Sequence, residues 1–230
     1  MLALADTWTD VTQATRHGYK GQLRWLLRRL EQYGAPPGIH EAINPGHRPP
    51  PRLQTCSQAQ LAAILAVASP ALRLAIHLAS QLGIRAGTIV TLGAAHYDAA
   101  PPTLTFLSKG DIPQRLPVTP DAVRLIEAAL TINPLVPFCQ ALNAYSYGAH
   151  TLRHEFQLAR ERAGVADHIT MHDLRRTLAH QVYHETRDLL TVQKLLGHTS
   201  IKATMIYLHG AHKEVSADLL TRLATTKGEA

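Results

Sequence analysis

The sequence predicts a mostly helical protein with one small antiparallel β-sheet, preceded by a small helical module. Three observations support this fold class. Apolar residues recur at helical spacing through most of the chain, the clearest strand signals fall within residues 93–118, and prolines accumulate between residues 36 and 52. We therefore divide the chain into a short first module (1–48), a larger domain (53–210) and a C-terminal tail (211–230).

The composition is that of a globular protein. Of the 230 residues, 46% are hydrophobic and 17% are charged, which favours neither disorder nor a coiled coil. Lys and Arg (23) outnumber Asp and Glu (17), so the formal net charge is +6. This charge favours a polyanionic partner without identifying one, because ribosomal and membrane-surface proteins share it.

Several classes of protein are disfavoured by what the sequence lacks. The two cysteines, Cys56 and Cys139, lack the close spacing of a zinc site or a disulfide framework. We find no secretory leader and no apolar run long enough to span a bilayer. A P-loop and a dinucleotide glycine motif are also missing, which argues against a nucleotide-driven motor.

The first module is predicted to be one basic helix followed by a linker. Residues 11–33 have helical periodicity, with leucines expected on one side: Leu23, Leu26, Leu27 and Leu30. Basic residues accompany them and are candidates for contacts to a polyanion: Arg16, Lys20, Arg24, Arg28 and Arg29. From 36 to 52 the prolines predict an extended, semi-rigid linker.

The larger domain begins with two helices and a β-meander. Ser57 is predicted to cap a helix through Val67, and Pro70 opens another that ends at Gly83, shortly before Arg85. Strands are expected near 96–98, 103–107 and 115–118, with a turn at Lys109-Gly110-Asp111. The rest is predicted to be helical, with a coil at 132–148; the helices are roughly 119–130, 149–163, 172–185, 187–196, 200–208 and 214–224.

His172 and Arg175 lie near the start of a helix whose apolar positions are Leu174, Leu178 and Val182. Both polar side chains are therefore expected to project together, away from the core. An imidazole can relay a proton, and a guanidinium can hold two non-bridging phosphate oxygens. Taken alone, however, this H-x-x-R pattern most often marks a solvated helix surface.

The same pattern occurs at His150 and Arg153, so one of the two pairs is a decoy. The chain between Arg175 and His198 is just long enough for a helix, a turn and a second helix, whereas Arg153 is farther away. We interpret His150 and Arg153 as a surface of the 149–163 helix.

His198 and Tyr207 follow at the end of the domain. Gly197 is predicted to end a helix, His198 to lie in the turn, and Ser200 to cap the next helix. Leu189, Leu190, Val192, Leu195 and Leu196 are expected to be buried in the first of these helices, and Ile201, Met205 and Leu208 in the second. Tyr207 is then expected to face a cleft. A phenol with a pKa near 10 is a useful nucleophile only among cations and proton acceptors.

Over residues 53–210 the chain resembles the tyrosine recombinase (phage-type integrase) family. The family signature is an arginine after a helix end, a hairpin lysine, H-x-x-R, a further His or Trp, and a tyrosine. The matching positions are Arg85, Lys109, His172, Arg175, His198 and Tyr207. Arg115 is an alternative for the lysine. Thr88 stands where the family often has an acidic residue.

The resemblance implies a tyrosine recombinase catalytic-domain fold and a site-specific DNA recombinase or integrase. Tyr207 would attack the scissile phosphate and form a 3′-phosphotyrosyl bond. Arg85 and Arg175 would neutralise the phosphate, and Lys109 would give a proton to the 5′-oxygen. His172 would act as acid or base on the tyrosine, and His198 as a hydrogen-bonding clamp.

The resemblance requires no cofactor and no metal. The partners it implies are double-stranded DNA, further copies of the chain in a tetramer on paired sites, and DNA-bending accessory proteins. It implies no membrane, and it implies a bacterial or phage-encoded protein that is cytoplasmic and associated with the nucleoid.

Two rival functions remain open. A type IB topoisomerase shares this catalytic set but relaxes supercoils without pairing two sites. A non-cleaving DNA-binding accessory protein would keep the fold, and the abbreviated first module is compatible with that role. In the tail, Val215, Leu219, Leu220 and Leu223 predict an apolar helix surface that packs either in cis or on the next protomer.

Overall fold

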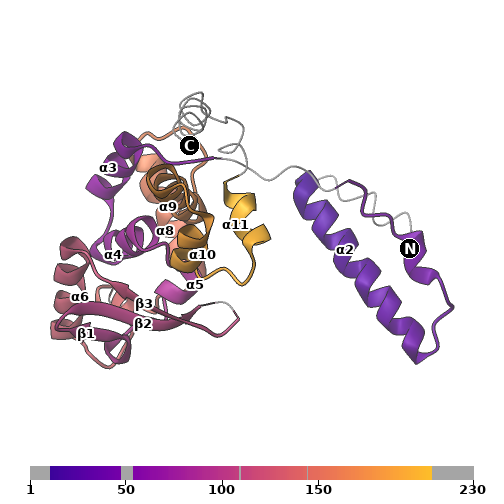
Figure 1. The fold of residues 1–230 in the computed structure, drawn as a ribbon, viewed down its shortest axis with the longest axis horizontal. Helices are drawn as coiled ribbons and strands as arrows, with labels where there is room; N and C mark the ends of the chain where they lie inside the picture. Colours follow the sequence, from indigo (N-terminus) through magenta and orange to yellow (C-terminus); the bar gives the residue numbers. More distant parts are fainter. Residues whose placement is uncertain (1–10, 48–53, 109, 144, 209–230) are drawn as a thin grey trace, which may run out of the picture. The chain divides into compact units, whose positions relative to one another are not determined.

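In the computed structural model, the described residues are 11–47, 54–108, 110–143 and 145–208 (Figure 1). Contacts divide the chain into two compact units, Met1–Arg52 and Leu53–Ala230. The described residues are mostly helical, with a three-stranded antiparallel sheet in the second unit. The predicted fold class is confirmed. The predicted helix at 214–224 lies outside the described residues.

The first unit is built on one long helix, α2 (Gln13–Leu30), which continues into the 3-10 helix η1 (Glu31–Tyr33). Thr12 caps α2 by accepting a hydrogen bond from the backbone N–H of Thr15 at 3.2 Å. Of the leucines expected on one side of the helix, Leu27 is buried, whereas Leu26 and Leu30 are exposed. A small module offers little surface to cover them.

The segment after α2 folds back on the helix. The 3-10 helix η2 (Ile39–Ala42) packs against α2, His17 Nδ1 lies 3.0 Å from the Pro45 carbonyl, and Arg24 donates to the Ile43 carbonyl at 3.3 Å. Residues 36–47 thus do not form the extended linker that the prolines predicted. The remainder of that linker, 48–52, lies outside the described residues.

The sheet of the second unit is an antiparallel meander of β1 (Tyr97–Ala99), β2 (Pro102–Ser108) and β3 (Ile112–Pro117), in that order. Its register pairs Thr105 with Arg115 and Ser108 with Ile112. Burial alternates along β3, so Gln114 and Leu116 share one side while Arg115 is on the exposed side. The strands agree with the sequence prediction and bring the hairpin tip close to the later helices.

The helices of the second unit also follow the prediction closely. Ser57 forms the expected cap of α3, within a capping box with Gln60, and Pro70 opens α4. Two short helices, α5 and α7, were not predicted, because four-residue helices carry no periodic signal. The helices are α3 (Gln58–Val67), α4 (Pro70–Gln81), α5 (Ala86–Ile89), α6 (Pro120–Ile132), α7 (Phe138–Ala141), α8 (Ala149–Arg162), α9 (Met171–Thr186), α10 (Leu189–Leu196) and α11 (Ile201–Tyr207).

Helix α9 carries the candidate site residues His172 and Arg175. It packs against α4, α10 and α11 (Figure 1). The main core includes almost every apolar residue of α4. A second, smaller cluster joins α9, α10 and α11 through Ala179, Val192, Leu196 and Leu208, with Tyr207 packed against it.

Two predictions about α10 and α11 are wrong in part. In α10, Val192 and Leu196 are buried and Leu189 and Leu195 are half-buried, but Leu190 is 55% exposed. In α11, Leu208 and Thr204 are buried, whereas Ile201 and Met205 are 42% and 49% exposed. Among the described residues, no helix is both long enough and apolar enough to cross a bilayer.

Candidate active site

Arg175 is the central cation of the candidate site, and it is buried. Its Nη1 donates to the Gly83 carbonyl after α4, and its Nη2 donates to the Leu196 carbonyl at the end of α10. The side chain is only 3% exposed, so it does not project away from the core as predicted. The side chain is buried because the two carbonyls accept its hydrogen bonds at the point where α9 meets the end of α4 and the end of α10.

Gly83 permits this approach. Its φ is +65°, and a Cβ at this position would lie 2.8 Å from Leu196 Cδ2. A side chain here would force the side chains of Leu196 and Leu178 to shift, besides being strained at this φ. The glycine therefore allows the Gly83 carbonyl to come within reach of Arg175.

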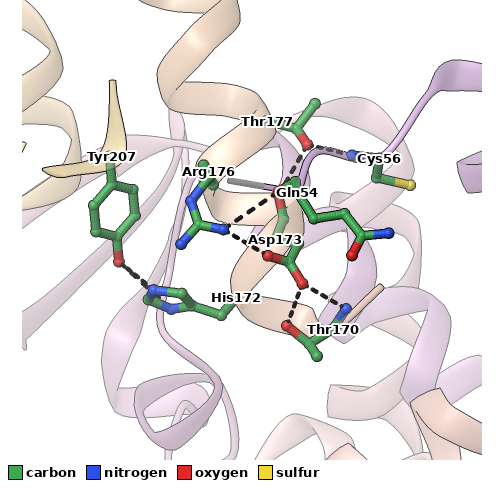
Figure 2. A network of polar contacts seen from close by, with 8 residues as sticks. All are labelled: Gln54, Cys56, Thr170, His172, Asp173, Arg176, Thr177 and Tyr207. Atoms are coloured by element: carbon green, nitrogen blue, oxygen red, sulfur yellow. Dashed lines mark hydrogen bonds and ion pairs between the residues drawn. The ribbon is translucent and has the colours of Figure 1, made fainter. Parts of the chain in front are cut away.

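His172 and Tyr207 meet between α9 and α11. Tyr207 Oη lies 2.9 Å from His172 Nε2, and the ring centroids are 5.1 Å apart (Figure 2). Tyr207 is half-buried and His172 is exposed. The phenol is therefore accessible at the surface while its hydroxyl is in hydrogen-bond contact with an imidazole.

His198 also packs against the Tyr207 ring. Its ring centroid is 4.9 Å from that of Tyr207, in an edge-to-face arrangement. Its Nδ1 is 3.0 Å from Thr204 Oγ1, which fixes the ring from within α11. His198 follows Gly197, which ends α10 as predicted and does so in the left-handed conformation.

The β2–β3 hairpin reaches this turn. A Cβ on Gly197 would lie 2.7 Å from Ser108 Oγ, and a Cβ on Gly110 would lie 3.3 Å from Thr199 Cγ2. Lys109, between Ser108 and Gly110, lies outside the described residues. The alternative, Arg115, is exposed and pairs with Asp98 at 3.7 Å on the side of β3 opposite Gln114.

Arg85 is the N-cap residue of α5 and lines a pocket of about 380 Å³ with His172 and Arg175. Arg153, on α8, lines the same pocket. His150 and Arg153 are exposed, as expected, but the sequence spacing did not predict that Arg153 borders the candidate site. That spacing measured distance along the chain, whereas α8 approaches the start of α9 in the folded unit.

Burial and the nearby arginines lower the pKa values of the His172 and His198 imidazoles. Partial burial, followed by the charges of Arg176 and Arg175, lowers the pKa of His172. Burial, followed by the charges of Arg175 and Arg85, lowers the pKa of His198 to about 4. Burial and the charge of Arg85 lower the pKa of Arg175 to about 10, which leaves the guanidinium charged at neutral pH. Neutral imidazoles beside a charged guanidinium can accept a proton while the cation attracts an anion.

Sequence reasoning missed one further pair, Asp173 and Arg176, which are ion-paired at 2.8 Å. The Arg176 guanidinium carbon lies 5.7 Å from the Tyr207 ring centroid (Figure 2). A signal was available, because Thr170 and Asp173 have capping-box spacing and Asp173 and Arg176 are three apart on one helix.

Within the described part of the chain, no group of three or more His, Cys, Asp or Glu side chains could hold a metal ion.

The basic residues expected to contact a polyanion differ in their exposure to solvent. Arg28 and Arg29 are exposed, whereas Arg16, Lys20 and Arg24 are half-buried. The uniform basic surface expected on α2 is thus reduced to its C-terminal end.

The sequence is similar to a known protein family and to several of its members. Residues 54–214 match the phage integrase family. A tyrosine recombinase XerC from Haemophilus ducreyi is 31% identical over 132 residues, which are 55% of this chain and 43% of the relative. XerC from Chlamydia pneumoniae is 30% identical over 133 residues, covering 54% and 42%. The matched region thus spans less than half the length of these curated relatives.

Solved structures share the fold. A lambda integrase (75–356) dimer bound to a COC′ core site has a TM-score of 0.71 and 18% identity, with 93% of this chain and 80% of that chain covered. XerH bound to difH substrate in a pre-cleavage complex has a TM-score of 0.69 and 20% identity, with 92% and 67% covered. At these identities the likeness is one of fold.

Proposed function

The chain belongs to the phage integrase family, and from this premise we propose that it is a site-specific DNA recombinase. It cleaves and rejoins duplex DNA through a 3′-phosphotyrosyl intermediate. The observation that carries the proposal is the contact of Tyr207 Oη with His172 Nε2 at 2.9 Å, beside the buried guanidinium of Arg175.

The reaction begins with attack of Tyr207 Oη on the scissile phosphorus. The P–O bond to the 5′-oxygen breaks as the bond to the phenol oxygen forms, so the number of phosphodiester bonds is conserved. His172 takes the phenol proton, because its lowered pKa keeps the imidazole neutral at neutral pH. His198 packs against the same ring and limits its movement.

Charge stabilisation comes from the arginines. Arg85 and Arg175 face the 380 Å³ pocket, where they would hold the non-bridging phosphate oxygens as negative charge develops. Because the carbonyls of Gly83 and Leu196 fix Arg175 in advance, little reorganisation is needed when the phosphate binds. Lys109 supplies the proton to the leaving 5′-oxygen. The next residue, Gly110, supports this role for the hairpin, because a Cβ added to it would lie 3.3 Å from Thr199 Cγ2 in the turn after α10.

The partners follow from the same proposal. Duplex DNA is the substrate, and the relatives solved with a core site or a difH substrate support this assignment. Recombination of two sites needs further copies of the chain, which we place in a tetramer on paired sites, with DNA-bending proteins as accessories. The proposed setting is the cytoplasm, where the protein, bacterial or phage-encoded, would be associated with the nucleoid.

The experiment traps the covalent intermediate. A target duplex is first selected by binding from a genomic or randomised pool, and a nicked version is then incubated with the full chain. We expect a heat-stable adduct with the wild type and none with Tyr207→Phe, which removes one hydroxyl and little packing. Tyr183→Phe, in the neighbouring cluster, is the matched control and should keep the adduct.

Other outcomes would reject the proposal. An adduct with Tyr207→Phe would show that another residue is the nucleophile. Binding without any adduct would favour the non-cleaving accessory protein. Relaxation of supercoiled DNA by a monomer, without pairing of two sites, would favour the type IB topoisomerase.

A further inference from the structure

A buried ion pair between Asp173 and Arg176 lies next to the Tyr207 ring. Asp173 and Arg176 are 3% and 6% exposed, and Arg176 Nη1 donates to Asp173 Oδ1 at 2.8 Å. Removing two charges from water is costly, and apolar side chains of similar volume often stabilise a fold as well or better. A pair of this kind therefore calls for a role besides stability.

The carboxylate of this pair is fixed on its other side. Asp173 Oδ2 accepts hydrogen bonds from the Thr170 N–H at 2.9 Å and from Thr170 Oγ1 at 2.7 Å (Figure 2). These contacts form the capping box at the start of α9. Asp173 is thus held by the same helix turn that presents His172.

The guanidinium is fixed by a second segment. Arg176 Nη1 donates to the Gln54 carbonyl at 3.3 Å. The Cys56 N–H donates to Thr177 Oγ1 at 2.8 Å, which ties the same segment to α9. Arg176 is therefore held between α9 and the first residues of the second unit, as Figure 2 shows.

Besides the two histidines, Arg176 also lies against the Tyr207 ring. Its guanidinium carbon lies over the ring, 5.7 Å from the centroid. His172 and His198 contact the ring in edge-to-face geometry, at interplanar angles of 65° and 62°. Two imidazoles and one guanidinium together limit rotation of the ring.

We propose that Arg176 is a positioning residue that holds the Tyr207 ring so that Oη stays at His172, with Asp173 and the Gln54 carbonyl fixing the guanidinium. The inference rests on the proposed role of Tyr207 as the nucleophile. Unlike Arg85 and Arg175, Arg176 does not line the 380 Å³ pocket proposed to hold the phosphate, so it acts through Tyr207. A small displacement of a nucleophile is enough to slow an attack strongly.

A purely structural role would give a different result, and Arg160 provides the comparison. Arg160 is 8% exposed and contacts His168 Nδ1 at 2.8 Å and Glu161 at 3.4 Å. It is a buried guanidinium in the same unit, with no part in the described site. Arg160→Lys therefore measures the effect of disturbing a buried arginine as such.

The test separates binding from chemistry in the full chain. Single-turnover cleavage of the nicked duplex is measured at saturating DNA, together with the Kd, for Arg176→Lys and Arg160→Lys. Lysine keeps the charge but loses the planar fork. We expect cleavage by Arg176→Lys to fall about tenfold or more at an unchanged Kd, and cleavage by Arg160→Lys to stay at the wild-type rate.

A second variant keeps the inference testable if Arg176→Lys fails to fold. Asp173→Asn with Arg176→Gln removes both charges together and keeps a polar side chain at each position, although glutamine is shorter than arginine, so no charge is left buried and unpaired. It should fold, bind DNA as the wild type does, and cleave slowly. Adding Arg176→Lys to His172→Gln should cost less than the product of the two single losses, because both act on the same hydroxyl.

The outcomes distinguish this inference from the proposed function. Wild-type cleavage rates in folded Arg176→Lys and in the double variant would overturn the inference while the wild-type adduct upheld the function. Equal slowing by Arg160→Lys would also overturn it. No adduct from the wild type would overturn both.

Discussion

The Arg175 side chain both binds two backbone carbonyls and lines the candidate phosphate site. Its replacement should therefore affect stability and cleavage. Arg175→Ala removes a preorganised donor from the candidate phosphate site, and we expect single-turnover cleavage to fall by about two orders of magnitude. It also leaves the Gly83 and Leu196 carbonyls without their donor, which should lower the free energy of unfolding by roughly 1–3 kcal/mol.

Arg153→Ala is the matched control. Arg153 borders the same pocket but is exposed on α8, so its loss should leave stability unchanged and slow cleavage far less. Urea unfolding and cleavage at saturating DNA measure the two effects. Equal losses of cleavage from both folded variants would contradict the assignment of Arg175 as the main phosphate ligand.

His198 makes the stability of the protein depend on pH. Burial lowers its pKa in the folded state from 6.5 to about 4, so the unfolded chain binds more protons between these values. The free energy of unfolding should therefore fall as pH drops from about 6.5 towards 4, with a contribution from this group of at most about 3 kcal/mol. Below the folded pKa its contribution no longer changes.

His198→Asn tests this dependence. The variant should be less sensitive to pH over that range, while His172 and His180, whose pKa values are also lowered by burial, maintain a residual slope. Urea titrations at a series of pH values measure the slope. A slope identical to that of the wild type would show that His198 is not the buried neutral group described.

At the scale of elements, Gly197 links the α10–α11 turn to the β2–β3 hairpin. Gly197→Ala imposes a left-handed conformation on a non-glycine residue, at about 1–2 kcal/mol. It also places a Cβ 2.7 Å from Ser108 Oγ, at the base of the Lys109 turn. We expect a larger loss of stability than strain alone gives, and slower cleavage.

Gly164 offers the matched control for this turn. Its φ is +68°, close to the +57° of Gly197, but a Cβ there meets nothing within 4 Å. Gly164→Ala should therefore show the strain alone and keep the wild-type cleavage rate. If both alanine variants lose the same stability and activity, the contact with Ser108 has no role in the site.

Elements with a long periodic pattern or a clear cap were predictable from the sequence. The capping residue Ser57, the opening Pro70 and the ending Gly197 mark helix limits through local chemistry, so they needed no knowledge of the fold. The order of the candidate site residues along the chain was likewise readable, because the family pattern is a pattern of sequence.

The side that a short helix buries could not be predicted in the same way. In α11, hydrophobicity favoured Ile201 and Met205 as buried, but Thr204 is the fully buried residue. It is buried because its hydroxyl bonds His198, a partner across the turn. The prediction for Arg175 was wrong for a similar reason, since its carbonyl partners lie in the segment after α4 and at the end of α10.

At the scale of the whole molecule, the two units are expected to divide the work on DNA. The second unit carries the candidate chemistry, and the first carries basic residues whose exposure differs along α2. Arg28 and Arg29 are exposed at its end, and the Arg29 guanidinium carbon lies 5.7 Å from the Trp25 ring centroid. Arg24, by contrast, donates to the Ile43 carbonyl within the unit.

This difference predicts distinct effects on DNA binding. If Arg28 and Arg29 each contact a phosphate, replacing both with Ala should reduce the slope of log affinity against log salt by about 2, because two fewer counterions are released. Arg24→Ala should instead destabilise the first unit, with a smaller change in slope. Binding isotherms at several salt concentrations measure the slope, and thermal unfolding measures the unit. An unchanged slope in the double variant would show that this end of α2 does not contact DNA, and a deletion of residues 1–48 that also left it unchanged would assign binding to the second unit alone.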